Sequence, residues 1–275
     1  MRGLMGTPAK KDMISDAINA LPASWQARLA GKTIVPVSTG MSGAAVFRVS
    51  AEHAIDHYLK IGTGTVADLL RQEIERTKWL ASAAIRVPRV LAHWAKDNVV
   101  AVAMSPLEGR SAEQIGDTDW RPAVAAVARA FARLHSLPVA TCPFDERLQL
   151  RLARASALVH SDAIDPAEFD ERNADLSPQQ LYDRVASRVP EHEDCVVTHG
   201  DATWSNLILG DDGQLGFVDC GHCGRADRYV DLALLAGELQ DRLGTNAFNT
   251  FTAAYGDLRW DESKAEFYRD LYEFF

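Results

Sequence analysis

The chain has 275 residues, of which 47% are hydrophobic and 24% charged, a composition typical of a globular protein with one large or two modest domains. No apolar run approaches the roughly 18 residues that a membrane-spanning helix needs, and residues 1–11 lack the apolar core of a signal peptide. Four cysteines are too few for a disulfide framework, so we expect a cytoplasmic location.

The net charge of −9 is unevenly distributed along the chain. Residues 1–103 carry 13 Lys and Arg against 8 Asp and Glu, whereas residues 104–275 carry 16 against 30. A basic first part suits a polyphosphate ligand, and an acidic second part repels nucleic acid and attracts cations. A solvated acidic surface without a ligand is the alternative interpretation.

The first part is predicted to be rich in strands. We expect a helix over 13–30, strands over 33–38, 44–49 and 56–61, a helix over 65–83, and strands over 89–96 and 98–103. The turn over 39–43 contains two glycines, and its backbone N–H groups can lie over phosphates. A plain hairpin is the commoner meaning of such a turn.

A charged pair is predicted between the strand over 56–61 and the helix that follows it. The apolar face of that helix consists of Leu69, Leu70, Ile74 and Leu80. Glu73 falls on the same face, and a carboxylate facing a core needs a partner. Lys60 is the only lysine that ends a preceding strand. A strand-Lys to helix-Glu pair positions nucleotide phosphates in kinases, with a purely structural ion pair as the alternative.

The composition changes from strand-rich to helix-rich at residues 104–109, which we interpret as a hinge. The backbone of Ser105 and Leu107 can still recognise adenine there, although Pro106 lacks an N–H. Helices are expected over 120–136, 147–162, 177–189, 228–243, 246–255 and 262–274. The predicted class is α+β, a bilobal, protein-kinase-like fold with a nucleotide-binding lobe over 1–103, a helical lobe over 110–275, and a cleft at the hinge.

Two polar loops in the second part carry the predicted chemistry. Asp201 and Asn206 have the Asp-x₄-Asn spacing of a kinase catalytic loop, in which the Asp accepts the substrate hydroxyl proton and the Asn holds Mg²⁺. Asp219 begins Asp-Cys-Gly at the place of the Mg²⁺-binding Asp-Phe-Gly of kinases. Each fragment alone is weak evidence, but the two together, in order and between strands, indicate phosphoryl transfer.

Cys220 and Cys223 have the Cys-x-x-Cys spacing of a metal or redox site, with His199 and His222 as candidate donors. The chain has no second Cys pair that would complete a zinc tetrahedron. We therefore favour two small residues in a tight loop over a metal site.

The whole set of motifs resembles the aminoglycoside phosphotransferases, and within them the aminoglycoside 3'-phosphotransferases. The most specific pieces are Thr141-Cys-Pro-Phe-Asp145, Val197-Thr-His-Gly-Asp201, Val218-Asp-Cys-Gly221, Ala226-Asp-Arg-Tyr229 and Glu273-Phe-Phe275. The resemblance implies that Lys60, oriented by Glu73, contacts nucleotide phosphates, that Ser42 and Gly43 lie in the nucleotide loop, and that Met104 guards the adenine pocket. It also implies that Asp201 is the catalytic base and that Asn206 and Asp219 bind Mg²⁺.

The resemblance further implies that carboxylates of the second part receive the ammonium groups of a drug: Glu168, Asp170, Glu171, Glu238, Glu273 and the terminal Phe275. The chain departs from the family where Trp204-Ser205 replaces Leu-Pro, and where His222 and Gly237 each replace an Arg and Tyr272 an Asp. We expect Trp204, His222 and Tyr272 to line a partly rebuilt substrate wall, with the indole narrowing the cleft or stacking on a ring.

The expected activity is therefore transfer of a phosphoryl group from ATP, with GTP as an alternative donor, to an aminoglycoside hydroxyl such as the 3'-hydroxyl of kanamycin. Alternatives are a kinase for streptomycin, choline, an amino alcohol or a sugar. For a substrate with a quaternary ammonium, such as choline, Trp204 and Tyr272 would form part of a cage around that group. A nucleotide sensor without catalysis is a third hypothesis. We expect a monomer or weak homodimer without nucleic-acid or membrane partners.

Overall fold

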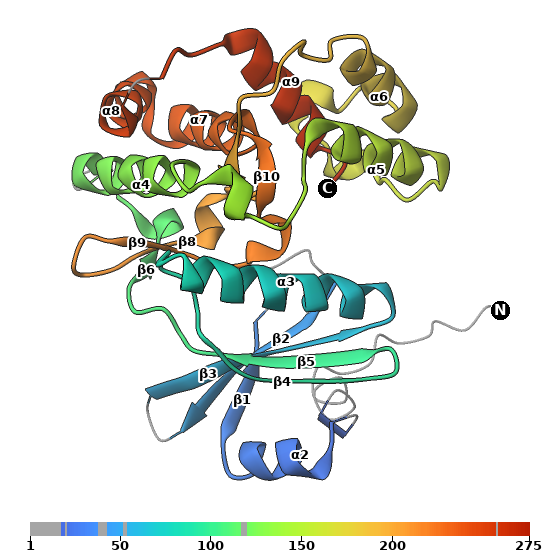
Figure 1. Cartoon of the computed structure of the whole chain (residues 1–275), viewed down its shortest axis with the longest axis vertical. Helices are drawn as coiled ribbons and strands as arrows, with labels where there is room; N and C mark the ends of the chain where they lie inside the picture. Colours follow the sequence, from blue (N-terminus) through green and yellow to red (C-terminus); the bar gives the residue numbers. More distant parts are fainter. Residues whose placement is uncertain (1–17, 20, 38–42, 52–53, 117–119, 257) are drawn as a thin grey trace, which may run out of the picture. The chain divides into compact units, whose positions relative to one another are not determined.

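A computed structural model describes residues 18–19, 21–37, 43–51, 54–116, 120–256 and 258–275. The chain divides into two compact units, one of residues 1–81 and 88–106, the other of residues 82–87 and 107–275 (Figure 1). The segment 82–87 belongs to the second unit because the carbonyl of Arg86 accepts the N–H of Phe217 at 2.8 Å. The guanidinium of Arg86 also donates to Asp212 at 2.9 Å.

The first unit is built on an antiparallel sheet in the order β1-β2-β3-β5-β4. Its strands are β1 (Thr33–Pro36), β2 (Ala45–Ala51), β3 (Ala54–Thr63), β4 (Val90–Lys96) and β5 (Val99–Met104). β3 lies between β2 and β5, with Lys60 opposite Val46 on one side and Val102 on the other. The strands that were expected from the sequence are all present, and none of their ends is shifted by more than two residues.

Two helices cover opposite faces of this sheet, α2 (Ala23–Leu29) and α3 (Thr65–Ser82), as Figure 1 shows. Successive side chains of a strand point to opposite faces. Ala101 and Ala103 of β5 accordingly pack in the cluster that contains α2, whereas Val100 and Val102 pack in the cluster with α3. β5 is buried on both sides, which explains its continuous apolar sequence.

Two details of the first unit differ from the sequence prediction. The helix expected over 13–30 does not continue through Pro22, which stands before α2 and lacks the N–H that a helix interior needs. Leu69, which was placed on the apolar face of α3, is 50% exposed, whereas Leu70, Ile74 and Leu80 are buried. The buried stripe of α3 is therefore narrower than the sequence indicated.

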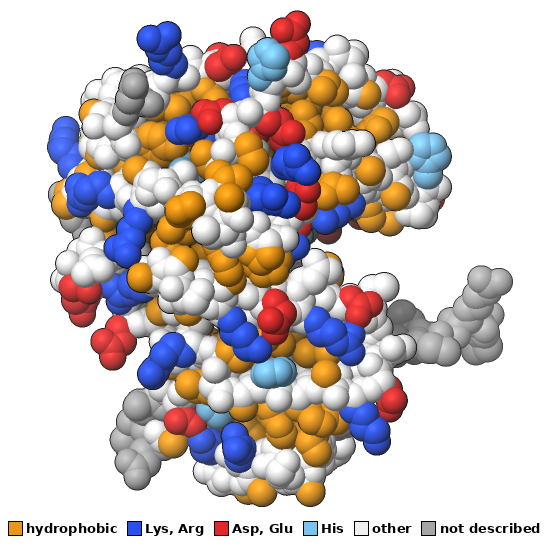
Figure 2. All heavy atoms as spheres, in the orientation of Figure 1, with side chains coloured by type: hydrophobic (Ala, Val, Ile, Leu, Met, Phe, Trp, Pro, Cys, Tyr) orange, Lys and Arg blue, Asp and Glu red, His pale blue; other side chains and the backbone are white. Residues whose placement is uncertain are grey.

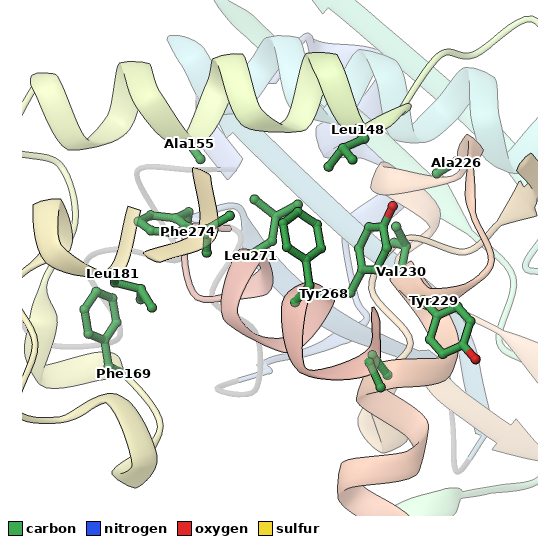
Figure 3. Close-up of a cluster of buried hydrophobic side chains, with 14 residues drawn as sticks. Leu148, Ala155, Phe169, Leu181, Ala226, Tyr229, Val230, Tyr268, Leu271 and Phe274 are labelled. Atoms are coloured by element: carbon green, nitrogen blue, oxygen red, sulfur yellow. The ribbon is translucent and has the colours of Figure 1, made fainter. Parts of the chain in front are cut away.

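The second unit consists mainly of helices. They are α4 (Trp120–His135), α5 (Leu148–His160), α6 (Pro178–Ala186), α7 (Tyr229–Leu243), α8 (Thr245–Tyr255) and α9 (Glu262–Tyr272). A core of apolar side chains from α5, α6, α7 and α9 holds this part together, and Figure 3 shows Leu148, Leu181, Val230, Leu271 and Phe274 in it. The ring of Phe274 packs in this core together with side chains of α5 and α6, which holds the C-terminal turn in place.

Short strands support the two polar loops. β7 (Cys195–Thr198) pairs with β10 (Gly224–Asp227), and β8 (Leu207–Leu209) lies between β6 (Arg110–Ser111) and β9 (Leu215–Phe217). Single 3₁₀ turns follow the loops at Trp204–Asn206 and Cys220–His222. β6 and β10, which the sequence analysis did not predict, are too short to show an alternating pattern.

Acidic and basic side chains are interspersed on the face drawn in Figure 2. The net negative charge of residues 104–275 therefore does not form one continuous acidic surface on this face.

The packing of Phe131 yields a prediction about stability. Its ring is fully buried in α4 and meets Phe217 of β9 edge-on, with centroids 5.1 Å apart. Phe131→Ala should lower the free energy of unfolding by about 3–5 kcal/mol, because it removes buried apolar surface and leaves a cavity. Urea denaturation checks this, with Leu150→Ala as the control.

Leu150 on α5 is 40% exposed, so the control should change stability by no more than about 0.5 kcal/mol. Equal losses in the two variants would contradict the packing described here.

Candidate active site

The polar loop after β7 is held from beneath by one buried carboxylate. Asp231 of α7, fully buried, accepts the backbone N–H of His199 and that of Gly200, each at 2.8 Å. Hydrogen bonds from backbone N–H groups to a charged acceptor are among the stronger ones in proteins. They fix the start of the loop relative to α7.

The carboxylate of Asp231 also forms a hydrogen bond with His135 of α4. The imidazole Nε2 lies 3.0 Å from the carboxylate, and Nδ1 lies 2.7 Å from the hydroxyl of Tyr255. Burial, the largest influence, raises the pKa of Asp231, but the hydrogen bond and charge of His135 and the bound N–H groups outweigh it and lower that pKa. A lowered pKa means that the associated stability is present at neutral pH and is lost as the pH falls through the folded-state value.

Gly200 makes a close approach that no other residue type allows. Its φ is +88°, and a Cβ at this position would lie 2.2 Å from the carbonyl oxygen of His222. The carbonyl of Gly200 accepts a hydrogen bond from Arg151 of α5 at 3.2 Å. The guanidinium of Arg151 is buried, and it lies 5.3 Å from the ring centroid of Phe275. The two polar loops therefore touch at Gly200.

The His199 ring links the same two loops. The N–H of Asp201 lies 3.3 Å from Nδ1 of His199, and Nε2 lies 2.9 Å from the carbonyl of Val218. These partners assign the proton to Nε2. The ring also stacks on Phe217, with centroids 5.6 Å apart.

The carboxylate of Asp201 is hydrogen-bonded at both oxygens. Nδ2 of Asn206 donates to Oδ2 at 2.8 Å and to the Asp201 carbonyl at 3.0 Å. The hydroxyl of Tyr272 donates to Oδ1 at 2.6 Å. Because the amide nitrogen of Asn206 is engaged in this way, its carboxamide oxygen is the atom suited to a cation.

Asp219 is brought next to Asn206 by the backbone. The N–H of Val218 donates to the carbonyl of Asn206 at 2.9 Å, and Asp219 follows with φ +56° and ψ 50°. A non-glycine residue in this left-handed region is uncommon, and such residues cluster at functional sites. Asp219 therefore lies in the turn between β9 and β10.

The oxygens of Asn206 and Asp219 suit Mg²⁺, which is usually held by one or two protein groups together with waters and substrate phosphates. Within the part of the chain that the structure describes, no three His, Cys, Asp or Glu side chains form a metal-binding group. The thiols of Cys220 and Cys223 are both buried.

The expected Lys–Glu pair is present in the first unit. Nζ of Lys60 on β3 lies 2.6 Å from Oε1 of Glu73 on α3, and both side chains are mostly buried. Gly43, with φ +69°, lies against the side chain of Val66 at the start of α3. Ser42 falls outside the described residues.

The hinge segment that is predicted to recognise adenine already uses one of its backbone groups in a hydrogen bond within the protein. The N–H of Ser105 donates to the carbonyl of Arg89 at 2.9 Å, and Met104 is buried at the end of β5. In the second unit, Leu107 covers Gly216, where a Cβ would lie 2.8 Å from Cδ1. Of the backbone groups at Ser105, the carbonyl is therefore the one suited to a ligand.

Residues 161–177 form an acidic connector between α5 and α6, and its carboxylates differ in exposure from Glu273 of the C-terminal turn. Glu168, Asp170 and Glu171 are exposed. Glu273 instead accepts a hydrogen bond from Asn173 at 2.6 Å and one from the N–H of Asp170 at 3.1 Å. It ties the connector to the end of α9, and burial, the largest influence, raises its pKa.

Glu238 of α7 accepts the backbone N–H of Trp204 at 3.3 Å. Burial, the largest influence, raises the pKa of Glu238 to about 7, so this carboxyl changes its charge near neutral pH. The indole of Trp204 is only 1% exposed and lies under the guanidinium of Arg242, 5.4 Å from it. The expectation that this ring stacks on a substrate or forms a cage is therefore corrected.

The remaining departures have different surroundings. His222 presents its backbone carbonyl to Gly200, whereas a Cβ at Gly237 would make only an ordinary van der Waals contact, 3.8 Å from the Arg269 side chain of α9. The Phe275 ring is partly exposed beside Arg151.

Comparisons with known proteins agree with this geometry. Residues 33–268 match the Phosphotransferase enzyme family. The chain is 31% identical to an aminoglycoside 3'-phosphotransferase of Escherichia coli over 245 residues, which is 86% of this chain and 89% of the relative. The chain belongs to the phosphotransferase enzyme family.

Two solved structures show the same fold as this phosphotransferase. One is an aminoglycoside-3'-phosphotransferase of type VIII, with a TM-score of 0.82 and 32% identity over 95% of this chain and 98% of that one. The other is APH(3'')-Id from Streptomyces rimosus in complex with ADP and streptomycin, with a TM-score of 0.81 and 29% identity over 97% and 98%. The predicted α+β, kinase-like fold is confirmed. Among the described residues, no helix of this phosphotransferase has the length and apolar character to cross a membrane.

Sequence reasoning missed the groups that hold the polar loop of Asp201, which are Asp231, His135 and Arg151. A signal for Asp231 was present, because it interrupts the apolar run of α7 just as Glu73 interrupts that of α3. Nothing in the sequence marked Arg151, whose partner is a backbone carbonyl.

The contact at Gly200 yields a prediction. Gly200→Ala should abolish most phosphoryl transfer and destabilise the protein, because the new methyl group would collide with the backbone of the second loop. Gly213→Ala is the matched control, with φ +74° and no atom within 4 Å of the added Cβ.

The control bears only the strain of a positive φ, about 1 kcal/mol, and should retain activity. Steady-state kinetics and thermal unfolding of both variants check this. Similar losses in the two would show that the clash with His222 does not matter.

Proposed function

We propose that this phosphotransferase transfers the γ-phosphoryl group of ATP to a hydroxyl of an aminoglycoside antibiotic, with resistance as the consequence. The observation that carries the proposal is the Asp201 carboxylate, which Asn206 and Tyr272 orient, in a loop whose Asn206 accepts a backbone hydrogen bond from Val218, the residue before Asp219. This is the arrangement that phosphoryl transfer to an alcohol requires. The similarity to aminoglycoside 3'-phosphotransferases supports the 3'-hydroxyl as the acceptor.

The two units carry different groups that are suited to the reaction. Lys60, held by Glu73, would bind nucleotide phosphates, and the backbone at Gly43 and Ser105 would border the nucleotide. Asn206 and Asp219 would hold Mg²⁺, which supplies positive charge to the phosphates when it is bound. The ADP in the related structure supports a nucleotide donor.

Asp201 would act on the acceptor. It takes the hydroxyl proton while the acceptor oxygen bonds to the γ-phosphorus, and the bond from that phosphorus to the β,γ-bridging oxygen breaks to release ADP. The remaining lone pairs of its carboxylate are suited to this proton. The exposed carboxylates Glu168, Asp170 and Glu171 would attract the cationic drug to the second unit.

The role of Asp201 as the base gives a prediction about turnover. Asp201→Asn should lower kcat by about 10²–10⁴-fold, because an amide cannot take the hydroxyl proton, while ATP binding persists. ADP release is measured with kanamycin, neomycin, streptomycin, choline and buffer alone, with and without EDTA. Undiminished turnover by the variant would rule out Asp201 as the base.

A second candidate acceptor is streptomycin, phosphorylated at its 3''-hydroxyl. The observation that favours it is the similarity to APH(3'')-Id over nearly the whole of both chains. Turnover with streptomycin but not with kanamycin or neomycin would select this candidate. Turnover with choline alone would retain the kinase chemistry and reject both drugs.

Glu238 gives a prediction about pH. With a pKa of about 7, its carboxyl is neutral below that pH and then attracts an ammonium group less. The KM of a polycationic acceptor should therefore rise as the pH falls from 8 to 6, and Glu238→Gln should flatten that dependence at a uniformly higher KM.

Glu75→Gln is the control, since this carboxylate is exposed on α3 and pairs only locally with Lys78. Its pH dependence should match the wild type. A Glu238→Gln profile parallel to the wild type would show that Glu238 does not bind the acceptor. The raised pKa also predicts that its ionisation reduces stability between the unfolded-state pKa of about 4.3 and about 7.

A further inference from the structure

Tyr272 touches the reacting carboxylate directly. It is the last residue of α9, and its hydroxyl lies 2.6 Å from Oδ1 of Asp201. The residues are 71 positions apart in the sequence. The contact therefore exists only because α9 returns to the catalytic loop.

The Tyr272 hydroxyl is the second of two hydrogen-bond donors to the Asp201 carboxylate. The terminal torsion of an Asp side chain is broad and roughly two-fold, so the backbone alone does not fix the plane of the carboxylate. Asn206 donates to Oδ2 and Tyr272 to Oδ1. Donors on different oxygens fix that plane and still leave a lone pair on each oxygen for an acceptor hydroxyl.

Tyr272 is itself rigidly placed. Its neighbours Leu271 and Phe274 are buried in the core of the second unit, where Figure 3 shows both. Glu273 is hydrogen-bonded to Asn173 in the connector. The phenol therefore cannot leave Asp201 without disturbing the packing of the C-terminal turn.

The hydroxyl of Tyr272 keeps its proton. Burial, and then the charge of Asp201 and the hydrogen bond to it, raise the pKa of the phenol above its usual value. Glu238 acts in the same direction, and the guanidinium of Arg151 opposes it. Tyr272 is thus a constant donor to Asp201 at neutral pH.

We propose that Tyr272 is a positioning residue for phosphoryl transfer, which holds the Asp201 carboxylate in the plane that receives the acceptor proton. The C-terminal turn of α9 then belongs to the active site through this contact, whichever acceptor the enzyme uses. The role in turnover rests on the proposed function, whereas the hydrogen bond itself can be tested without it.

The chain offers a matched pair of variants. Tyr272→Phe removes the hydroxyl that binds Asp201. Tyr268→Phe removes a hydroxyl one turn earlier on the same helix, and the buried Tyr268 hydroxyl has no hydrogen-bond partner among the described residues. Both changes preserve the ring and its packing, so only the lost hydrogen bond distinguishes them.

We expect Tyr272→Phe to lower kcat about tenfold to a hundredfold, the effect of losing a hydrogen bond to a charged group, with the KM for ATP unchanged. Tyr268→Phe should retain the wild-type kcat. Equal kcat values for Tyr272→Phe and the wild type would overturn the proposal, as would a loss seen only in KM. If neither the wild type nor Tyr268→Phe phosphorylates any aminoglycoside, the proposed function fails instead.

A second measurement does not depend on an acceptor. The melting temperature is compared for the wild type, Tyr272→Phe, Asp201→Ala and the double variant. Tyr272→Phe should lower the melting temperature only while residue 201 is an Asp, because the two residues then share a hydrogen bond. The same shift in both backgrounds would overturn the contact, and with it the proposal, even if no acceptor has been found.

Discussion

Two hydrogen bonds from consecutive backbone N–H groups to Asp231 determine where the polar loop of Asp201 lies. A fully buried carboxylate is costly unless it is paired, and here His135 and the two N–H groups pair it. His135 is in turn held by Tyr255, so helices α4, α7 and α8 meet at this one network. The position of the loop is therefore set by the packing of three helices. The backbone of a polar loop without regular structure is thereby held in a defined place.

The loop of Asp201 is also in contact with the second polar loop, which contains Asp219. The His199 ring spans the two, and Gly200 allows their backbones to approach without a Cβ between them. As a result, the candidate base and the two candidate metal ligands lie in two loops of the same unit that contact each other directly. Preorganised groups of this kind need no rearrangement as charge develops during phosphoryl transfer.

The acidic residues of the second unit serve two purposes. Glu273 is hydrogen-bonded within the protein and fixes the connector to α9, whereas Glu168, Asp170 and Glu171 remain exposed. Glu238 stands between these cases, since it accepts a backbone N–H but has a pKa near 7. The net charge of the sequence counted all of them alike. Only the structure separates carboxylates that stabilise the fold from those that can attract a cation.

The sequence by itself determined the order of the main helices and strands, the pairing of Lys60 with Glu73, and the presence of an Asp-x₄-Asn loop followed by Asp219. These follow from local periodicity and spacing, which depend on residues close together in the chain. The tertiary structure decided that the indole of Trp204 is buried, that Asp231 holds the catalytic loop, and that Tyr272 reaches Asp201. Each of these features depends either on contacts between residues at least 30 positions apart or on which side of a loop faces the core. A local sequence pattern encodes neither long-range contacts nor the orientation of a loop.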